Sequence, residues 1–189
     1  MKNIGLPLSP TLWRSCRVLA NEQRLKMLRA LLTQSPQTVS DIAAAMAVSV
    51  AVSSDYLRLL QSRGLIRSER IGRQVLYTDA PDPAVPDAAT LLDALRTTLT
   101  VRKEPLPGVL QTLTAFTHPR RILIVRALDR QPVQTSVLGR TTGISSQALS
   151  RHLSKLERRG VIEHERGRVC LCGGGSPLMR CLLRLARGR

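Results

Sequence analysis

An internal repeat is the feature that most constrains the fold of this 189-residue chain. Three segments of the first half match three of the second half in order: 18–32 with 115–129, 35–49 with 131–145, and 56–73 with 152–168. The offset is 97 residues in the first pair and 96 at the glycine of the third, so one residue is missing between them. Shared order over this length is more than shared composition produces. The chain is therefore expected to hold two copies of one small structural unit.

Each copy begins with an amphipathic helix that is followed by a shorter helix. Apolar residues recur at helical spacing in the first helix: Leu25, Leu28, Leu31 and Leu32 in the first copy, and Ile122, Val125 and Leu128 in the second. A short helix rich in small residues is expected after Pro36, over Thr38–Ala45, and after Pro132, over Thr135–Thr141. These two helices would begin a helix-turn-helix.

A third helix and a hairpin complete each copy. The turns Ala47–Ser49 and Gly143–Ser145 make Ser49 and Ser145 the expected N-caps of the third helix. This helix should end at Gly64 or Gly160, where glycine supplies a left-handed C-cap. LIRSERIGRQVLYT and VIEHERGRVCLC then predict two short strands around a glycine turn. The fold class is thus mainly α with small β-hairpin wings, a tandem winged helix-turn-helix.

A proline-rich connection separates the copies. TDAPDPAVPD (78–87) has three prolines and should be extended, and Asp87 should cap a helix over Ala88–Val101. A closing helix over Pro177–Ala186 follows the second copy. The inward faces of these two helices are Leu91, Leu92, Leu95 and Leu99, and Leu178, Cys181, Leu182 and Leu185. We therefore divide the chain into unit 1 (residues 1–79), a linker with a pairing helix (80–107), and unit 2 with its closing helix (108–189).

The charge of the chain favours a polyanionic partner. It has 29 Lys and Arg against 13 Asp and Glu, a formal net charge of +16, which attracts nucleic acid or an anionic membrane surface. No apolar run approaches the roughly 18 residues needed to cross a bilayer. MKNIGLPLSPTLW, at the start, lacks the apolar stretch of a signal peptide. A cytoplasmic protein is expected, in which the four cysteines are reduced and form no disulfide framework.

LANEQRLKMLRALL, FTHPRRILIVRAL and ISSQALSRHLSKLERRGVI resemble the ArsR family of bacterial winged-helix repressors. The resemblance covers nearly the whole chain, as two units in tandem. It is weaker in unit 1, where SDYL (54–57) stands in place of the SRHL (150–153) of unit 2. The family implies operator binding by dimers that pair through their first and last helices. With two units in one chain, it implies an intramolecular pseudo-dimer, with a homodimer as a further option.

The third helix of unit 2 presents residues suited to DNA. Its inner stripe is Leu149, Leu153 and Leu156, with Ala148 beside it, and its outward residues are Ser146, Gln147, Ser150, Arg151, Ser154 and Lys155. Gln pairs with adenine edges and Arg with guanine edges, and the first residues of such a helix enter the groove deepest. The predicted base-reading residues are Ser146, Gln147, Ser150 and Arg151. The predicted phosphate contacts are Ser145, Lys155, Arg158 and Arg159. A merely solvated face is the alternative, and His152 is either packed or a phosphate donor.

Arginines flank both predicted hairpins: Arg67, Arg70 and Arg73 in unit 1, and Arg166 and Arg168 in unit 2. Such arginines commonly contact the DNA backbone, which adds affinity and salt dependence but little sequence information. The alternative is that they only keep the hairpins soluble.

The third helix of unit 1 fits DNA less well. The same register places Val52, Tyr56, Leu57 and Leu60 inside, and Val50, Ala51, Ser54, Asp55 and Arg58 outside. Asp55 stands where unit 2 has Arg151, and a carboxylate that faces phosphates weakens binding. The hypothesis is that unit 2 dominates sequence reading, while unit 1 contributes a backbone contact through Arg58 or serves as a pairing scaffold.

Three cysteines need to be weighed as a soft-metal or arsenite site, because Cys170 and Cys172 face one side of a strand and Cys181 lies in the next helix. His164 would add a nitrogen ligand. The Cys-x-Cys that the resemblance would place near the helix-turn-helix is missing from Thr38–Ala45, so packing is preferred, and no metal or cofactor is predicted. CGGGSP (172–177) lacks the spacing of a phosphate-binding loop and is expected to be a flexible joint.

The predicted function is sequence-specific binding of double-stranded DNA by a transcriptional regulator, which the resemblance makes a repressor. The three histidines are scattered and form no catalytic constellation, so an enzyme is not expected. The alternatives are a tandem winged-helix replication initiator and a chromosome-segregation adaptor. A membrane-surface role of LMRCLLRLARGR (178–189) is a third option, although its leucines are needed for the core.

Overall fold

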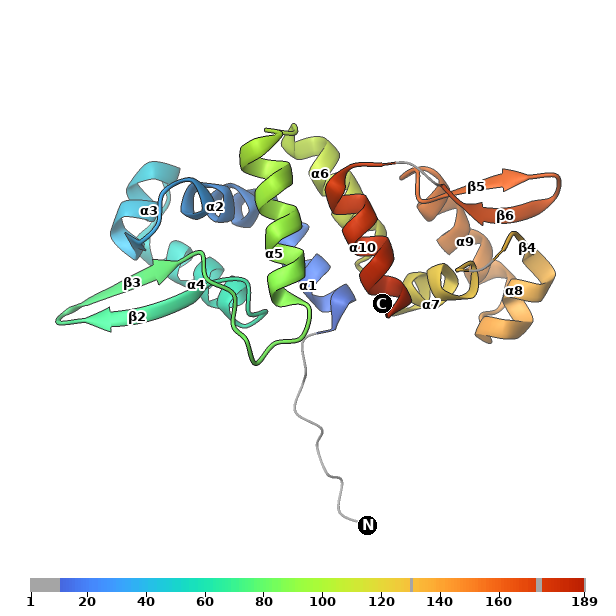
Figure 1. Ribbon diagram of the computed structural model, residues 1–189, viewed down its shortest axis with the longest axis horizontal. Coiled ribbons are helices and arrows are strands. Elements are labelled where there is room, and N and C mark those ends of the chain that lie inside the picture. The colour runs from blue at the N-terminus through green and yellow to red at the C-terminus, as the bar shows by residue number, and fades with distance from the viewer. Residues whose placement is uncertain (1–10, 130, 173–174, 189) are drawn as a thin grey trace, which may run out of the picture.

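The computed structural model describes residues 11–129, 131–172 and 175–188. The molecule is elongated, with a winged helix-turn-helix at each end and a group of helices between them (Figure 1). The first half of the chain contains α1 (Leu12–Leu19), α2 (Glu22–Thr33), β1 (Gln37–Thr38), α3 (Val39–Met46), α4 (Val50–Gln61), β2 (Arg67–Ile71), β3 (Gln74–Thr78), α5 (Ala88–Arg96) and the π-helical turn η1 (Thr97–Val101). The second half contains α6 (Leu106–Ala115), α7 (Pro119–Ala127), β4 (Val133–Gln134), α8 (Thr135–Thr142), α9 (Ser146–Glu157), β5 (Ile162–Glu165), β6 (Arg168–Leu171) and α10 (Pro177–Arg187).

The two halves are related by an approximate two-fold arrangement. In Figure 1, a half-turn about the line of sight brings α3 near the position of α8 and the hairpin β2–β3 near that of β5–β6. The same operation exchanges α5 and α10, which lie side by side in the middle. Helices α4 and α9 start 96 residues apart, as the sequence offset predicts. The internal repeat is therefore visible as a structural repeat.

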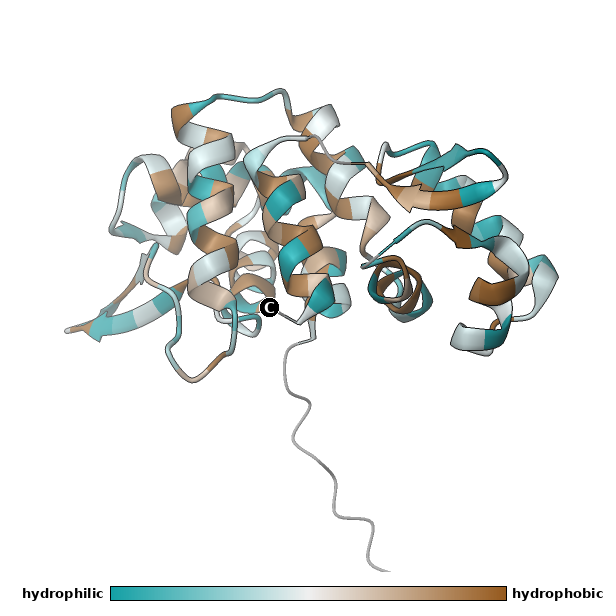
Figure 2. Cartoon of the chain, turned by 45° about the vertical axis from the view of Figure 1, so that its right-hand side comes forward, coloured by the Kyte–Doolittle hydropathy of each residue, from teal (hydrophilic) through white to brown (hydrophobic). Residues whose placement is uncertain are grey.

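The middle helices bury the leucines of both halves in one aliphatic core. Helix α1 packs against α6 and α10, and α5 packs against α10. The eight predicted inward residues of α5, η1 and α10 are all buried, and they belong to a single cluster that runs through both units. Figure 2 shows hydrophobic and hydrophilic residues alternating along these helices, as amphipathic helices require. The two units are consequently fixed to each other by a shared core.

The helix-turn-helix of each unit forms where the sequence predicts it. The chain bends by 111° between α3 and α4, within the usual range for this motif. Ser49 caps α4 by accepting a hydrogen bond from the Val52 amide at 3.2 Å. Ser145 occupies the N-cap position of α9, but its side chain makes no capping bond, which corrects the prediction. Gly64 and Gly160 have φ of 69° and 65°, so both take the predicted left-handed conformation, just past the C-cap residues Ser62 and Arg158.

Each wing is a three-stranded antiparallel sheet rather than a bare hairpin. Strand β3 pairs with both β1 and β2, and β6 pairs with both β4 and β5. The hairpin loops have two residues each, as the pairings Ile71 with Gln74 and Glu165 with Arg168 show. Sequence periodicity missed β1 and β4 because two residues are too few to show alternation.

The connection between the units differs from the expectation at Asp87, at the end of α5 and at the start of α6. Asp87 does not cap α5: it has φ of 65° and its side chain makes no capping bond, whereas an N-cap residue has extended backbone. The expected helix Ala88–Val101 is α-helical only to Arg96 and then continues as η1, where the Arg102 amide bonds the Thr97 carbonyl five residues back at 2.9 Å. The expected boundary between residues 107 and 108 falls within α6.

The proline-rich connection is packed onto unit 1. The Asp82 amide bonds the Gly64 carbonyl at 2.9 Å, and Arg96 forms an ion pair with Asp79 at 2.6 Å. A Cβ at Gly64 would lie 2.6 Å from Cβ of Val85, so this glycine is required both by its φ and by the close approach of the connection.

Within the described part of the chain, no single helix has the length and apolar character needed to cross a membrane. Helices α3 and α4 reach that length and composition only as a pair that is bent by 111°.

Candidate nucleic-acid interface

Helix α9 presents the face that the sequence predicts. Its inner leucines are buried, with Leu149 packed against Gly139 of α8. The side chains that point to solvent are Ser146, Gln147, Ser150, Arg151 and Ser154. Lys155 is half-buried, so it is less outward than predicted. The N-terminal half of α9 therefore offers small hydroxyls, one amide and one guanidinium on an exposed surface.

A buried arginine on α7, Arg121, joins α7 to the end of α6. Arg121 is 4% exposed and its Nε bonds the Ala115 carbonyl at 2.5 Å. Its Nη2 bonds the Thr117 hydroxyl at 2.7 Å, which ties α7 to the end of α6. Arg24 makes the corresponding bond to the Val18 carbonyl in unit 1. This repeated contact fixes the first two helices of each unit, and sequence reasoning had matched the two arginines without finding their role.

Arg159, which the sequence predicts to contact phosphate, is bonded to α6 through one of its donors. Its Nε donates to the Thr114 hydroxyl at 2.7 Å, because the chain after α9 turns back toward α6. Gln111 of α6 also donates to the Arg158 carbonyl at 3.2 Å. The Arg158 side chain stays exposed.

A group of cations surrounds the last turn of α9. The pKa of Lys155 is lowered, first by its partial burial and then by Arg121, Arg159 and Arg158. Repulsion of this kind is relieved when an anion approaches. The local potential is thus suited to a phosphate.

His152 is half-buried against a second histidine. Its ring lies 4.6 Å from that of His118, and His118 caps α7 by accepting the Arg120 amide at Nδ1, 3.1 Å away. Burial, followed by the charges of His118, Arg121 and other neighbours, lowers the pKa of His152 to about 4. A histidine with a pKa this low carries no charge near pH 7 in the free chain.

Helix α4 of unit 1 has a different surface. Leu57 and Leu60 are buried as predicted, but Val52 is 39% exposed and Ser53 is buried in its place. The prediction was wrong here because Ser53, a polar residue, occupies the position of Leu149 in unit 2. The Ser53 hydroxyl has no hydrogen-bond partner among the described residues.

The first half of α4 contains no basic residue, and Arg58, further along the helix, is paired with Asp55. Ala51, Asp55 and Arg58 are exposed. Asp55 and Arg58 lie 3.8 Å apart in an ion pair whose side chains are 73% and 72% exposed. Such a pair is weak, but it places a carboxylate where unit 2 has a free guanidinium.

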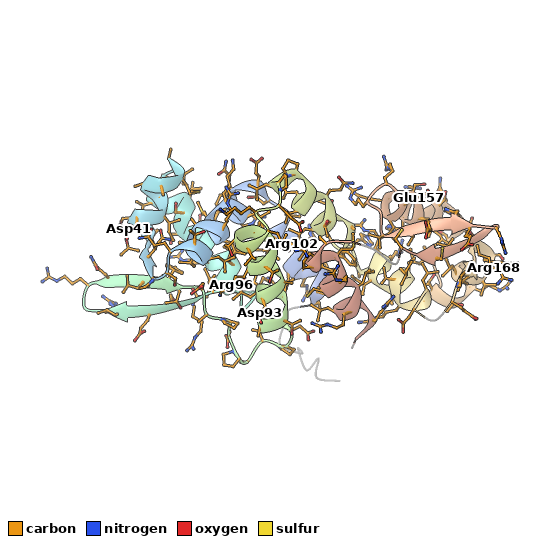
Figure 3. All side chains as sticks on the ribbon, turned by 45° about the horizontal axis from the view of Figure 1, so that its top comes forward. Asp41, Asp93, Arg96, Arg102, Glu157 and Arg168 are labelled. Atoms are coloured by element: carbon orange, nitrogen blue, oxygen red, sulfur yellow. The ribbon has the colours of Figure 1, made fainter. Side chains whose placement is uncertain are left out.

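The two wings differ in charge. The hairpin β2–β3 carries Arg67, Arg70 and Arg73 against a single glutamate, Glu69, and all four are exposed. The hairpin β5–β6 carries Arg166 and Arg168, also exposed, against Glu163 and Glu165. His164 of that hairpin lies 2.9 Å from Glu157 of α9. Figure 3 shows Arg168 near the far end of the molecule, away from the middle helices. The basic wing therefore belongs to the unit with the less basic helix.

The three cysteines weighed as a metal site are not brought together. The Cys170 thiol is directed to the Glu163 carbonyl at 3.5 Å, whereas Cys181 is buried on α10 and directed to the Thr90 carbonyl at 3.6 Å. Burial raises the pKa of all three thiols. No group of three metal-ligating side chains occurs in residues 11–129, 131–172 and 175–188. Two glycines of the predicted joint, Gly173 and Gly174, lie outside the described residues, as do residues 1–10 at the start.

Two family models match the chain, one in each unit. The model described as bacterial regulatory protein, arsR family, matches residues 21–68, from the N-cap of α2 into β2. The model of the MarR family matches residues 117–169, the corresponding stretch of unit 2. The chain is an ArsR-like tandem winged helix-turn-helix protein. The ArsR match falls on unit 1, where the SDYL stretch had resembled the family less.

Two similar curated proteins have the names of transcriptional regulators. This ArsR-like chain is 43% identical over 60 residues to a transcriptional repressor SmtB homolog of Synechocystis sp., which covers 32% of the chain and 45% of that protein. It is 38% identical over 55 residues to the HTH-type transcriptional regulator YgaV of Escherichia coli, covering 29% of the chain and 56% of that protein. The chain spans about half the length of these relatives. Their names agree with the expectation that the chain is not an enzyme.

A solved structure is also similar in sequence to the ArsR-like chain. It is the homodimeric winged helix-turn-helix DNA-binding domain of a possible ArsR-family transcriptional regulator from Mycobacterium bovis, determined by NMR. The identity is 32%, and the match covers 49% of this chain and 79% of that one, with a TM-score of 0.38.

Proposed function

We propose that this chain is a sequence-specific DNA-binding transcriptional regulator, with α9 in the major groove and the arginine-bearing wings on the backbone. The observation that carries the proposal is the exposed N-terminal face of α9, which is held on a helix-turn-helix in a chain of net charge +16. A helix in this position fits the major groove, and its first turns reach the base edges.

Base recognition is assigned to four residues of α9: Ser146, Gln147, Ser150 and Arg151. Gln147 can pair with adenine and Arg151 with guanine, each through two hydrogen bonds. The serines are small enough to let the helix approach the bases closely. Arg151 takes part in no ion pair among the described residues, so its guanidinium is available.

Backbone contacts are assigned to residues around α9 and on the wings: Ser145, Lys155, Arg158, Arg166, Arg168, Arg58, Arg67, Arg70 and Arg73. Ser145 supports this assignment because its hydroxyl is not used to cap α9 and remains exposed. Hydroxyls and cations that flank a recognition helix position it without specifying sequence.

The two units act as an intramolecular pseudo-dimer in this proposal. The shared core of α1, α5, α6 and α10 fixes the distance between α4 and α9 within one chain. A conventional regulator of this type needs two copies to present two such helices to adjacent grooves. We keep the division into unit 1, pairing helix and unit 2 as part of this proposal, with α6 counted wholly in unit 2.

The two units contribute unequally to binding. Unit 2 supplies the base-reading helix, and unit 1 supplies the more basic wing, which adds affinity that is independent of sequence. The DNA site in this proposal therefore has two halves: unit 2 recognises the base sequence of one half, and unit 1 binds the phosphates of the other. Repression follows if this site overlaps a promoter, as the name of the Synechocystis relative would suggest.

Genome-wide crosslinking of the chain to DNA, followed by sequencing of the bound fragments, tests the proposal. We expect enrichment at promoters and, for purified protein, tighter binding to an enriched fragment than to its shuffled sequence. Enrichment confined to replication origins would favour the initiator alternative. The absence of any preferred sequence would contradict a sequence-specific regulator.

A further inference from the structure

A cleft of about 420 Å³ lies between α5, which follows unit 1, and α10, which closes unit 2. Each half of the chain supplies one wall: Thr90, Asp93, Ala94 and Thr97 from α5 and the start of η1, and Pro177, Arg180, Cys181 and Arg184 from α10. This volume is within the range of small-molecule sites. The cleft is complete only when both halves are in place.

The α10 wall carries two guanidinium groups that no carboxylate neutralises. Arg180 and Arg184 are exposed and lie one helical turn apart. Neither forms an ion pair with any described residue, whereas Arg187 on the same helix pairs with Asp129 at 2.8 Å. Arg180 uses Nη1 to bond the Gly175 carbonyl at 2.6 Å, which steadies the side chain and leaves its other N–H donors free.

The α5 wall is polar but carries less charge. Asp93 is the one carboxylate lining the cleft, so the two arginines leave it with a net positive charge. Thr90 and Thr97 add hydroxyls that can donate or accept a hydrogen bond. Thr97 begins η1, and single π-helical turns are frequently found at functional sites. The complementary molecule has an anionic end toward α10 and a hydroxyl or amino group toward α5.

We propose that this cleft binds a small organic anion, a carboxylate or a phosphate ester that also bears hydroxyl or amino groups. Arg180 and Arg184 hold the anionic group, and Asp93 with the two threonines holds the polar remainder. Paired guanidinium groups recognise carboxylate and phosphate oxygens through charge-assisted hydrogen bonds. Figure 3 shows Asp93 on α5 in the middle of the molecule and Arg168 on the wing at one end, so the cleft residue Asp93 lies apart from that wing.

A ligand that contacts both walls is expected to affect how the two units are held relative to each other. Helices α5 and α10 pack against each other at the approximate two-fold axis (Figure 1). A change in their packing alters the separation of α4 and α9, and with it the fit to DNA. This effect on DNA binding rests on the proposed function, whereas binding of the anion does not.

Calorimetric titration of the full chain with citrate and with pyrophosphate, in 150 mM chloride, tests the site without DNA. We expect one-to-one saturable binding of at least one probe, and the tighter probe distinguishes a carboxylate from a phosphate ligand. The variant R180Q/R184Q should bind at least about tenfold more weakly, because two charge-assisted hydrogen-bonding groups are lost. The control R29Q/R140Q removes two exposed arginines of α2 and α8 and should bind within about twofold of the unaltered chain.

Equal losses in the two double variants, or no saturable binding, would overturn the site and leave only diffuse attraction to a basic chain. Both pairs of side chains are exposed, so thermal melts should show that the variants fold. At saturating probe, affinity for a bound DNA fragment should change by about fivefold or more, and should not change in R180Q/R184Q. Saturable binding with unaltered DNA affinity would overturn the bridging effect. Failure to bind any DNA specifically would count against the proposed function alone.

Discussion

The two units share a backbone plan but differ in how their polar side chains are used. In unit 1, Thr38 and Asp41 form a reciprocal capping box on α3, with bonds of 3.1 and 3.0 Å, and Ser49 caps α4. The bonds from Thr38 lower the pKa of Asp41. In unit 2, the corresponding N-cap residues of α8 and α9 make no side-chain capping bond. Unit 1 uses these groups to stabilise its own helices, and unit 2 leaves Ser145 exposed for a partner.

The same contrast holds for the outer faces. Unit 1 has Ala51 and Asp55 where unit 2 has Gln147 and Arg151, while its wing carries the excess of arginine. A repeat in one chain permits this divergence, because the shared core holds both units in place whatever the outer face of either helix carries. The comparison teaches that structural equivalence of the two units does not imply equivalent roles.

The largest expected effect concerns the buried position that differs between α4 and α9. L149A should lower the free energy of unfolding by about 2–5 kcal/mol, because it removes a fully packed leucine. S53A, at the equivalent position, should lower the free energy of unfolding by no more than about 1 kcal/mol, or raise it. The reason is that this substitution removes a buried hydroxyl that has no hydrogen-bond partner among the described residues. Urea unfolding monitored by circular dichroism measures both. Equal losses would show that the two helices are packed alike, against this account.

Base reading by α9 gives the next effect. R151A should raise the Kd for a specific site by about 5- to 150-fold, equivalent to about 1–3 kcal/mol for a lost two-bond contact to a base. R58A should raise it less than about threefold, because Asp55 already lies 3.8 Å from Arg58 and both are exposed. A fluorescence binding titration compares them. A loss from R58A as large as that from R151A would make the two helices equal partners.

The wings are distinguished by salt dependence. Replacing Arg67, Arg70 and Arg73 by alanine should lower the slope of log K against log salt by nearly 3, at about 0.9 per phosphate contact. Replacing Arg166 and Arg168 should lower it by less than about 2, because Glu163 and Glu165 weaken the approach of that wing to phosphate. Titrations at several salt concentrations give the slopes. A larger change per arginine in unit 2 would reverse the assignment.

The smallest effect is a pH dependence specific to unit 2. His152 has a pKa of about 4 when folded and a reference value of 6.5, so the unfolded chain binds the additional proton between these values. Stability is therefore lost as pH falls from about 6.5 toward 4. H152Y introduces the residue that unit 1 has at Tyr56 and should reduce the fall in Tm between pH 7 and 5. Part of the fall should remain, because the pKa of His118 is lowered as well. An equal fall in Tm in the unaltered chain and in H152Y would exclude His152 as a source of the pH dependence.

The elements of the fold were predictable because they depend on local pattern. Helical spacing of leucines defined the buried faces of α2, α5 and α10, and Gly64 and Gly160 marked the ends of α4 and α9. The exposed face of α9 followed from the same register. Because the chain contains two copies of the unit, most elements were predicted twice, from two different stretches of sequence.

The departures came from contacts between segments distant in sequence. Ser53 is buried because α4 repeats the packing of α9, whereas the sequence analysis had placed Val52 inside. Arg159 bonds Thr114 of α6, a helix that the sequence analysis did not predict. The cleft depends on α5 and α10 meeting across the chain, so no local sequence pattern around Arg180 and Arg184 could indicate it.

The most direct test of unequal units is a single-base substitution scan across a bound site. The account predicts that substitutions with a large effect on Kd cluster in one half-site, beneath α9. The other half, about one helical turn (roughly 10 base pairs) away, should tolerate substitution while remaining protected from cleavage. An inverted repeat with equal sensitivity in both halves would contradict it.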